Sequence, residues 1–319
     1  MGFLLLALNF NCLSLILLRY YKFFKKNIIF SNKITGQIED IRGIAHTYNN
    51  LALIYQEMEE TEKAIEHYLK SIVELTKIGD SRSLAQAHNN LALIYQQNEN
   101  WEDAYTYHQH SLNEKEKNDD QKGLAQTYKN LGMVCQAKRE WGATIEYYQK
   151  ALQLRDHLST SDVQKIFINL GIAYQELGEN DLAVDALEKA IKYAAEDSEL
   201  DLLAQTYGNL GVALYEKKEF RPAIRLLNQV LFYYLKQDAL ENVKKVSRVF
   251  YRIQTKMADK EFNQLADQEL NRIIADGIWW KDRQILTGDE AKEILKQMKE
   301  PKQQRRTESE REAEEGEKV

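Results

Sequence analysis

The chain has 319 residues, more than one compact core of ordinary size usually holds. Its net charge of −6 and its isoelectric point near 5.7 give no support to general nucleic-acid binding. Its two cysteines, Cys12 and Cys135, lie far apart, which excludes a disulfide framework and fits a reducing compartment. With 14 glycines and only 2 prolines, little of the sequence is typical of loops, so the composition indicates a soluble protein rich in helices.

The first 40 residues contain an apolar run, residues 3–18, that is shorter than the roughly 20 residues a bilayer span needs. Positive charges follow this run and none precedes it. Two interpretations are open. The run is a membrane anchor, whose following charges would keep the repeats on the cytoplasmic side. Alternatively, residues 1–40 are a degenerate half-copy of the repeat described next, with an apolar part that covers its end or that reflects a wrongly assigned start codon.

Between residues 41 and 240 one pattern recurs five times. The asparagines shared by the copies are separated by 40, 40, 39 and 40 residues, which excludes chance. A helix pair of this size cannot bury its apolar stripe alone, so the copies must stack into a solenoid. The matching segments are TYNNLALIYQ (47–56), AHNNLALIYQ (87–96), TYKNLGMVCQ (127–136), FINLGIAYQ (167–175) and TYGNLGVALY (206–215).

Each copy has the pattern of two helices joined by a short polar turn, such as residues 57–60. In the first copy, the first helix places two aromatic residues, a leucine and a small residue on one face. The second helix carries a second stripe at helical spacing. The two stripes are Tyr48, Leu51, Ala52 and Tyr55, and then Ala64, Tyr68, Ser71, Ile72 and Leu75.

This pattern resembles the tetratricopeptide repeat (TPR), and the resemblance covers about 200 of the 319 residues. The period exceeds the family's usual length of about 34 residues, as in the extended subtype of kinesin light chains, Leu-Gly-Asn-repeat scaffolds and bacterial peptide-sensing regulators. Cys135 and Leu214 depart from the pattern at its tyrosine position, and Thr144 at its alanine position. The resemblance implies an all-α fold, a right-handed superhelical solenoid of antiparallel helix pairs whose first helices line a concave groove.

Opposite the core face of the first helices, an asparagine and an apolar residue recur in every copy. An asparagine side chain both donates and accepts hydrogen bonds, so a ladder of them can hold the main chain of an extended peptide. In the subtype that this chain resembles, such asparagines contact bound peptides. The alternative is that they bond only to neighbouring helices, while the apolar residues pack between copies. The predicted peptide-binding residues are Asn50, Asn90, Asn130, Asn169 and Asn209, with Leu53, Leu93, Met133, Ile172 and Val212, flanked by Gln56, Gln96, Gln136 and Gln175.

After Leu240 the pattern decays. Residues 241–256 and 257–276 are typical of a degenerate helix pair that caps the stack. Four cations at helical spacing form a basic stripe, which is either a solvated face or a contact for an acidic partner. They are Lys244, Lys245, Arg248 and Arg252.

The last part of the cap begins at Gly277, which is expected to end its second helix. Trp279 and Trp280 are expected to fold back onto the cap. The spacing from Thr287 to Glu290 predicts a capping box before a last helix over 288–299. The predicted domains are therefore 1–40, 41–240 with five repeats, 241–299 as the cap, and 300–319 as a charged, disordered tail.

The sequence shows no nucleotide-binding glycine motif, zinc-ligand spacing or nucleophile elbow. We therefore expect a cytoplasmic scaffold that is not an enzyme, that needs no cofactor or metal, and that binds a partner protein or peptide and no nucleic acid. Two other hypotheses remain. A membrane-tethered assembly factor depends on residues 3–18, and a peptide-responsive signalling regulator would require an appended output domain.

Overall fold

The computed structural model describes residues 41–194 and 199–299. The predictions for residues 1–40, with their apolar run 3–18, and for the tail 300–319 lie outside the described residues. Among the helices that are described, none combines the length and the apolar character that a bilayer span requires.

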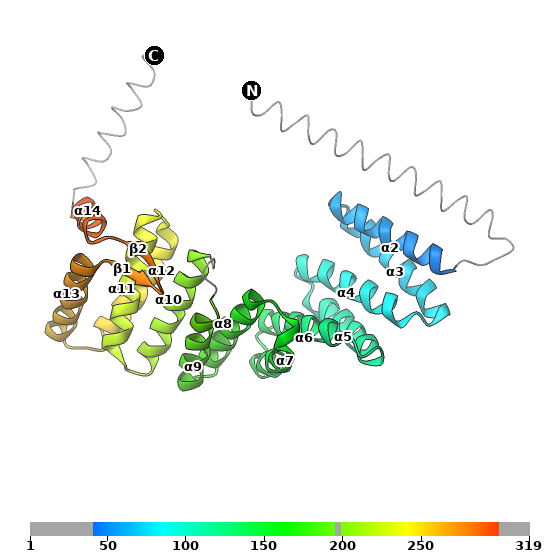
Figure 1. Cartoon of the computed structure of the whole chain (residues 1–319), viewed down its shortest axis with the longest axis horizontal. Coiled ribbons are helices and arrows are strands. Elements are labelled where there is room, and N and C mark those ends of the chain that lie inside the picture. Colours follow the sequence, from blue (N-terminus) through cyan, green and yellow to red (C-terminus); the bar gives the residue numbers. More distant parts are fainter. Residues whose placement is uncertain (1–40, 195–198, 300–319) are drawn as a thin grey trace, which may run out of the picture. The chain divides into compact units, whose positions relative to one another are not determined.

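The chain divides into two compact units, with the boundary between Ser159 and Thr160 (Figure 1). The described part of the first unit consists of three helix pairs and a short 3-10 helix at its end. The pairs are α2 (Ile41–Glu57) with α3 (Thr61–Ile78), α4 (Ser81–Gln97) with α5 (Trp101–Lys117), and α6 (Gln121–Ala137) with α7 (Trp141–Gln153), followed by η1 (Arg155–His157).

The described part of the second unit continues the series of helix pairs and ends in a small β hairpin and one more helix. The pairs are α8 (Thr160–Glu176) with α9 (Asn180–Tyr193), α10 (Leu200–Glu216) with α11 (Phe220–Lys236), and α12 (Leu240–Gln254) with α13 (Asp259–Asp276); β1 (Ile278–Trp280), β2 (Arg283–Leu286) and α14 (Gly288–Lys299) follow. The predicted architecture of consecutive helix pairs is confirmed, and within the described residues the structure adds the short helix η1 and the antiparallel hairpin.

The turn inside each pair closes in the same way in all five predicted copies. The second residue after the first helix has a left-handed backbone. The N–H of the residue that follows it donates to the carbonyl five positions earlier, at 2.9 Å in each copy. Because this turn repeats, corresponding side chains of each copy take corresponding positions. The left-handed residues are Glu59, Glu99, Arg139, Gly178 and Lys218, with φ between 58° and 76°.

The buried side chains follow the stripes that the sequence predicts. In the first pair Ala52 and Tyr55 of α2 pack against Ala64 and Tyr68 of α3, and Leu51 of α2 is buried as well. The hydroxyl of Ser71, also buried, donates to the carbonyl of Ala45 at 2.8 Å and ties α3 to α2. Leu91 and Ile94 of α4 belong to the same buried cluster, so neighbouring pairs share a narrow core, as expected for a solenoid.

A small residue on each first helix allows the second helix to approach closely. In the third pair this residue is Gly132, and a Cβ atom added there would lie 2.6 Å from Cε1 of Tyr148. Real Cβ contacts are longer, so alanine at this position would require the Tyr148 ring to shift.

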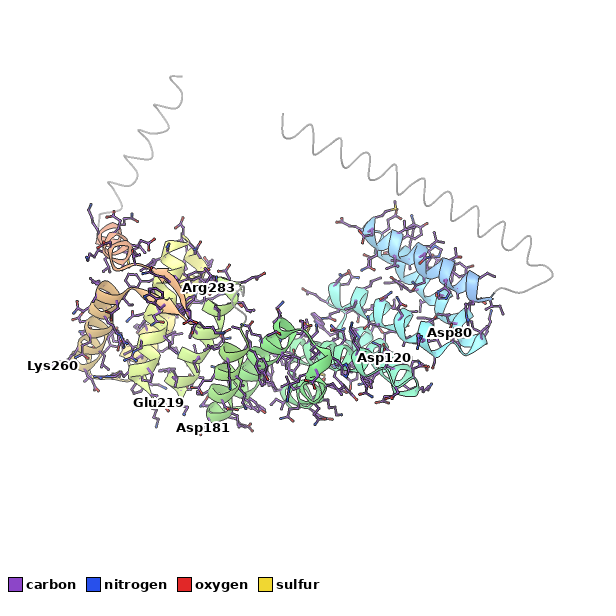
Figure 2. The ribbon with its side chains drawn as sticks, viewed as in Figure 1. Asp80, Asp120, Asp181, Glu219, Lys260 and Arg283 are labelled. Carbon is purple, nitrogen blue, oxygen red and sulfur yellow. The ribbon has the colours of Figure 1, made fainter. Side chains whose placement is uncertain are left out.

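Aspartates begin two of the first helices in the first unit (Figure 2). Asp80 accepts from the backbone N–H of Ser83 at 3.1 Å, and Asp120 accepts from that of Gly123 at 2.9 Å. Each carboxylate satisfies an amide that would otherwise lack a partner at the start of α4 or α6.

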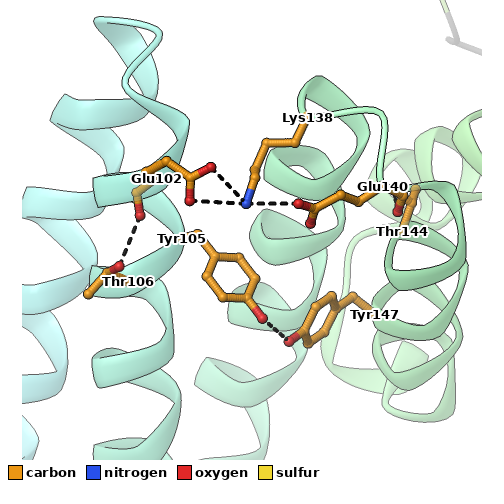
Figure 3. Close-up of polar contacts among 7 residues, drawn as sticks. All are labelled: Glu102, Tyr105, Thr106, Lys138, Glu140, Thr144 and Tyr147. Atoms are coloured by element: carbon orange, nitrogen blue, oxygen red, sulfur yellow. Dashed lines mark hydrogen bonds and ion pairs between the residues drawn. The ribbon is translucent and has the colours of Figure 1, made fainter.

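Neighbouring pairs are also joined by a lysine in the turn that follows a first helix (Figure 3). Nζ of Lys138 lies 3.1 Å from Glu102 of the preceding pair and 2.9 Å from Glu140, while the hydroxyls of Tyr105 and Tyr147 lie 2.9 Å apart. In the second unit, Lys217 repeats the ion pairs with Asp181 and Glu219 at 3.0 and 2.9 Å. These exposed pairs add little stability and chiefly fix which copies lie side by side.

The two tryptophans of the hairpin lie in different surroundings. Trp280 is fully buried in β1, and its ring packs on Tyr207 of α10 and Tyr233 of α11, in the fifth pair. Trp279 points away from this core and is exposed. The alternation of a strand accounts for the difference, because successive side chains point to opposite faces.

The predicted end of α13 and the predicted capping box are confirmed. Gly277 follows α13 with a φ of 72°. The N–H of Thr287 donates to Oε2 of Glu290 at 2.7 Å, and the N–H of Glu290 donates back to Oγ1 of Thr287 at 3.2 Å. The carboxylate of Glu290 also accepts from Nζ of Lys236 at 2.7 Å, which connects α14 to α11, and this lysine holds the pKa of Glu290 near 2.

Candidate functional site

The asparagines of the predicted row differ in accessibility. Asn50 is exposed, Asn90, Asn169 and Asn209 are half-buried, and Asn130 is buried with 5 % of its surface exposed. Oδ1 of Asn130 accepts from Nε2 of Gln126 at 3.4 Å along α6. The position is therefore shared by all copies, but its exposure is not.

The apolar residues beside the asparagines all reach the surface. Leu53 and Met133 are each 41 % exposed, and Leu93, Ile172 and Val212 are half-buried. Folding does not bury these side chains fully, although water is an unfavourable environment for them. In each unit, these apolar side chains at the surface of the first helices are available to a partner.

In the second unit, three of the ten predicted residues line one cleft of about 450 Å³. Ile172 of α8 and Asn209 and Val212 of α10 meet there, beside the amides of Gln205 and Asn242. The floor of the cleft is apolar and comes from α11 and α12, with Leu227, Val230, Tyr234, Val246 and Val249. A few convergent amides over an apolar floor are typical of a binding site.

The first unit has a different cleft, of about 640 Å³, between the beginnings of α4 and α6. Gln86 and Gln126 line it, four residues before Asn90 and Asn130, which do not. Lys115 also lines this cleft. None of these three residues was among the predicted peptide-binding residues. Lys115 was nevertheless a visible departure from the repeat, because the first copy has Leu75 at that position.

The glutamines predicted to flank the row are engaged inside the fold. Oε1 of Gln56 accepts from the hydroxyl of Tyr68 at 3.5 Å, and Oε1 of Gln136 accepts from that of Tyr148 at 3.0 Å. Nε2 of Gln175 donates to the carbonyl of Asn209 at 3.2 Å and so connects α8 to α10. These side chains position the helices that carry the row.

The second pair has a histidine where the first and third have this tyrosine. Nε2 of His108 lies 3.4 Å from Oε1 of Gln96, the same contact with a different ring. Burial raises the pKa of Tyr68 to about 12 and lowers the pKa of His108 to about 4. Both rings are therefore neutral near pH 7, which suits a hydrogen bond inside a core.

The described residues contain no group of three or more histidine, cysteine, aspartate or glutamate side chains placed to hold a metal ion. Cys135 is a buried, free thiol, and burial raises its pKa to about 12. A thiol with such a pKa is an unreactive core residue at physiological pH.

The tetratricopeptide-repeat family model matches residues 43–113, 83–157 and 162–234, which together make up more than half of the chain. The chain belongs to the tetratricopeptide-repeat family. The predicted TPR-like solenoid of helix pairs is thus confirmed. A search of curated protein sequences finds no match to this TPR protein.

Solved structures similar to this TPR protein include BtubC (BKLC) from P. vanneervenii and the apo form of RapI. BtubC is 20 % identical, with a TM-score of 0.53, over 67 % of this chain and 89 % of that one. RapI is 16 % identical, with a TM-score of 0.57, over 72 % of this chain and 83 % of that one. At these identities the likeness concerns the fold.

Proposed function

We propose that this TPR protein is a scaffold that binds an extended segment of a partner protein on the asparagine-bearing face of its first helices. Members of the family bind protein or peptide partners, which supports the general role. The observation that supports the peptide site is the cleft of the second unit, because it brings Ile172, Asn209 and Val212 together.

The two kinds of side chain in this cleft suit the two parts of an extended peptide. The peptide main chain carries a donor and an acceptor at each residue, and the amides of Asn209 and Gln205 supply both. The side chains of the peptide alternate in direction, so every second one meets the apolar floor beside Ile172 and Val212. We place the main contacts at Asn209 and not at Asn130, whose side chain is buried.

Replacing Asn209 and Val212 together by alanine is expected to weaken peptide binding about tenfold, since amide hydrogen bonds and apolar contact are both lost. Peptides would be selected from a random phage-displayed library on the full-length wild-type chain, and their affinities measured by fluorescence anisotropy. Helix content and melting temperature of the variant should stay close to wild type, because both positions lie at the surface of α10.

The matched control is Asn263→Ala, which removes an exposed asparagine from α13, outside the cleft. It should leave the affinity of every selected peptide unchanged. Selected peptides that bind the double variant as tightly as wild type would show that the proposed face is not the peptide site. A library that yields no binding peptide would contradict peptide binding altogether.

A further inference from the structure

Lys115 occupies a position that an apolar side chain fills in the first pair. Its counterpart there, Leu75, is buried, and Lys115 is itself only 8 % exposed. Nζ of Lys115 donates to Oγ1 of Thr127 at 2.6 Å, and that hydroxyl donates in turn to the carbonyl of Gly123 at 2.9 Å. The lysine therefore has one neutral acceptor for three N–H donors.

This ammonium group has no carboxylate of the described residues within ion-pair distance, 4 Å. Burial lowers the pKa of Lys115, and the more distant Asp120 opposes that effect. A buried cation without a counter-ion is unfavourable, so an anion that reached it would be bound strongly.

Lys115 lines the 640 Å³ cleft of the first unit, which has two further cations, Arg82 and Lys122. Both are exposed, and neither forms an ion pair with a described residue. The two carboxylates of the cleft are already engaged, since Asp120 caps α6 and Oδ1 of Asp119 accepts from Nε2 of Gln121 at 2.5 Å. None of the three cations of the cleft therefore has an ion-pair partner among the described residues.

We propose that this cleft binds an aspartate or glutamate side chain of the partner segment, with Lys115 as the anchoring cation. The inference rests on the proposed function above, because the acidic residue belongs to a peptide segment that contacts first helices, here α4 and α6. Gln86 and Gln126, which line the cleft, hold the peptide main chain on either side of that residue. Charge-assisted hydrogen bonds between ammonium and carboxylate are stronger than those between neutral groups.

A singly charged carboxylate fits the cleft better than a phosphate dianion. Three cations, Arg82, Lys115 and Lys122, and two carboxylates, Asp119 and Asp120, line the cleft. One negative charge of a ligand balances this excess cation and a second is left unbalanced, so we assign the cleft to acidic side chains and not to phosphorylated ones.

The test is a titration of the full-length chain with an oligoglutamate peptide that is acetylated and amidated, so that it has no terminal charges. An oligoglutamine peptide of equal length is the uncharged probe. We expect the oligoglutamate to bind at least about tenfold more tightly than the oligoglutamine, with an affinity that falls as salt is added. Free glutamate and inorganic phosphate are titrated separately and should bind far more weakly, because they lack the main-chain contacts.

Two variants test the anchor, Lys115→Leu, which installs the residue of the first pair, and Lys115→Met, which keeps the length of the side chain. Each should weaken oligoglutamate binding about tenfold and leave oligoglutamine binding unchanged. The melting temperature should rise, because a buried charge gives way to an apolar group. The control Lys117→Leu removes an exposed lysine from the same helix, outside the cleft, and should change the affinity by less than about twofold.

Equal binding of both peptides, or unchanged oligoglutamate affinity in folded Lys115→Leu and Lys115→Met, would overturn the acidic-residue site. So would binding of phosphate or free glutamate as tight as that of the peptide, which would indicate a site for small anions. If display-selected peptides still depend on Asn209 and Val212, this inference fails alone and the proposed function stands. If no peptide of either kind binds, both fail.

Discussion

Acidification from pH 6.5 to pH 4 is expected to unfold the first unit while the second unit stays folded. The first unit holds two buried histidines, His88 and His108, and burial lowers the pKa of each to about 4. All six histidines of the chain lie at or before His157, so the second unit has none. The acid response of the chain should therefore be confined to one half of the sequence.

The direction follows from the proton balance. An unfolded histidine titrates near pH 6.5, so between pH 6.5 and 4 the unfolded state binds protons that the folded state excludes. The stability due to each neutral histidine is complete above pH 6.5 and is lost as the pH falls toward 4. The loss is about 3 kcal/mol for each ring, so the two rings together lose about 6 kcal/mol, which lies within the roughly 5–15 kcal/mol by which folded proteins are stable.

The neighbours of the two rings add to burial. For His88 the second cause is the nearby His110, whose ring lies 5.1 Å away, while Glu114 acts in the opposite direction. For His108 the second cause is Lys115. In both cases, burial and the neighbouring groups of the folded state together lower the pKa of the ring.

The repeat itself provides the matched variant. His88 and His108 stand where the first and third copies have tyrosine, namely Tyr48 and Tyr128, and Tyr68 and Tyr148. The variant His88→Tyr with His108→Tyr should remove most of the acid sensitivity, because a phenol stays neutral throughout this range. Thermal melts of the variant and of wild type at pH 7 and pH 4.5, monitored by circular dichroism, would measure this acid sensitivity.

The control is His46→Gln, which changes an exposed histidine to the residue found at this position in the second and third copies. It should keep the acid transition of wild type. Hydrogen exchange assigns the transition to a unit, and simultaneous loss of protection in α4 and in α10 near pH 5 would contradict the prediction.

The sequence predicts the paired helices well, because each helix pair is specified by the spacing of its apolar residues and by a turn that recurs from copy to copy. Leu51, Ala52 and Tyr55 share a face at helical spacing, and they are buried in the structure as that spacing requires. The capping box of Thr287 and Glu290 needs only four consecutive residues, so it too could be predicted.

The candidate sites depend on contacts between elements, and the repeat pattern does not determine these contacts. Asn130 has the same register as Asn50, yet it is buried where Asn50 is exposed. The cleft at Lys115 is formed by α4, α5, α6, the turn before α6 and the short helix η1, and its charge balance depends on how Asp119 and Asp120 are engaged. A prediction that follows the shared residues of a repeat overlooks the copy in which one of them has changed.

The two adjacent tryptophans of the hairpin were also beyond sequence reasoning, since nothing in Ile278–Leu286 distinguishes the one that turns inward. Trp280 is fully buried, its ring lies 5.2 Å from that of Tyr207 and 5.1 Å from that of Tyr233, and its Nε1 donates to Oε1 of Gln229 at 3.1 Å. Trp279 is 53 % exposed, and its Nε1 donates to the carbonyl of Asp276 at 3.1 Å.

Trp280→Ala is therefore expected to lower the free energy of unfolding of the second unit by about 3–5 kcal/mol, because it leaves a large cavity between α10, α11 and the hairpin. Trp279→Ala should lower it by less than about 1 kcal/mol, so the neighbouring tryptophan is the matched control. Denaturant unfolding followed by circular dichroism gives the two free energies, and hydrogen exchange of α10 and α11 locates the loss. Equal losses in the two variants would mean that the hairpin does not close the core of this unit. A selective loss at Trp280 would show that a short segment outside the repeat pattern completes the stack, because without it the aromatic faces of Tyr207 and Tyr233 would be open to water.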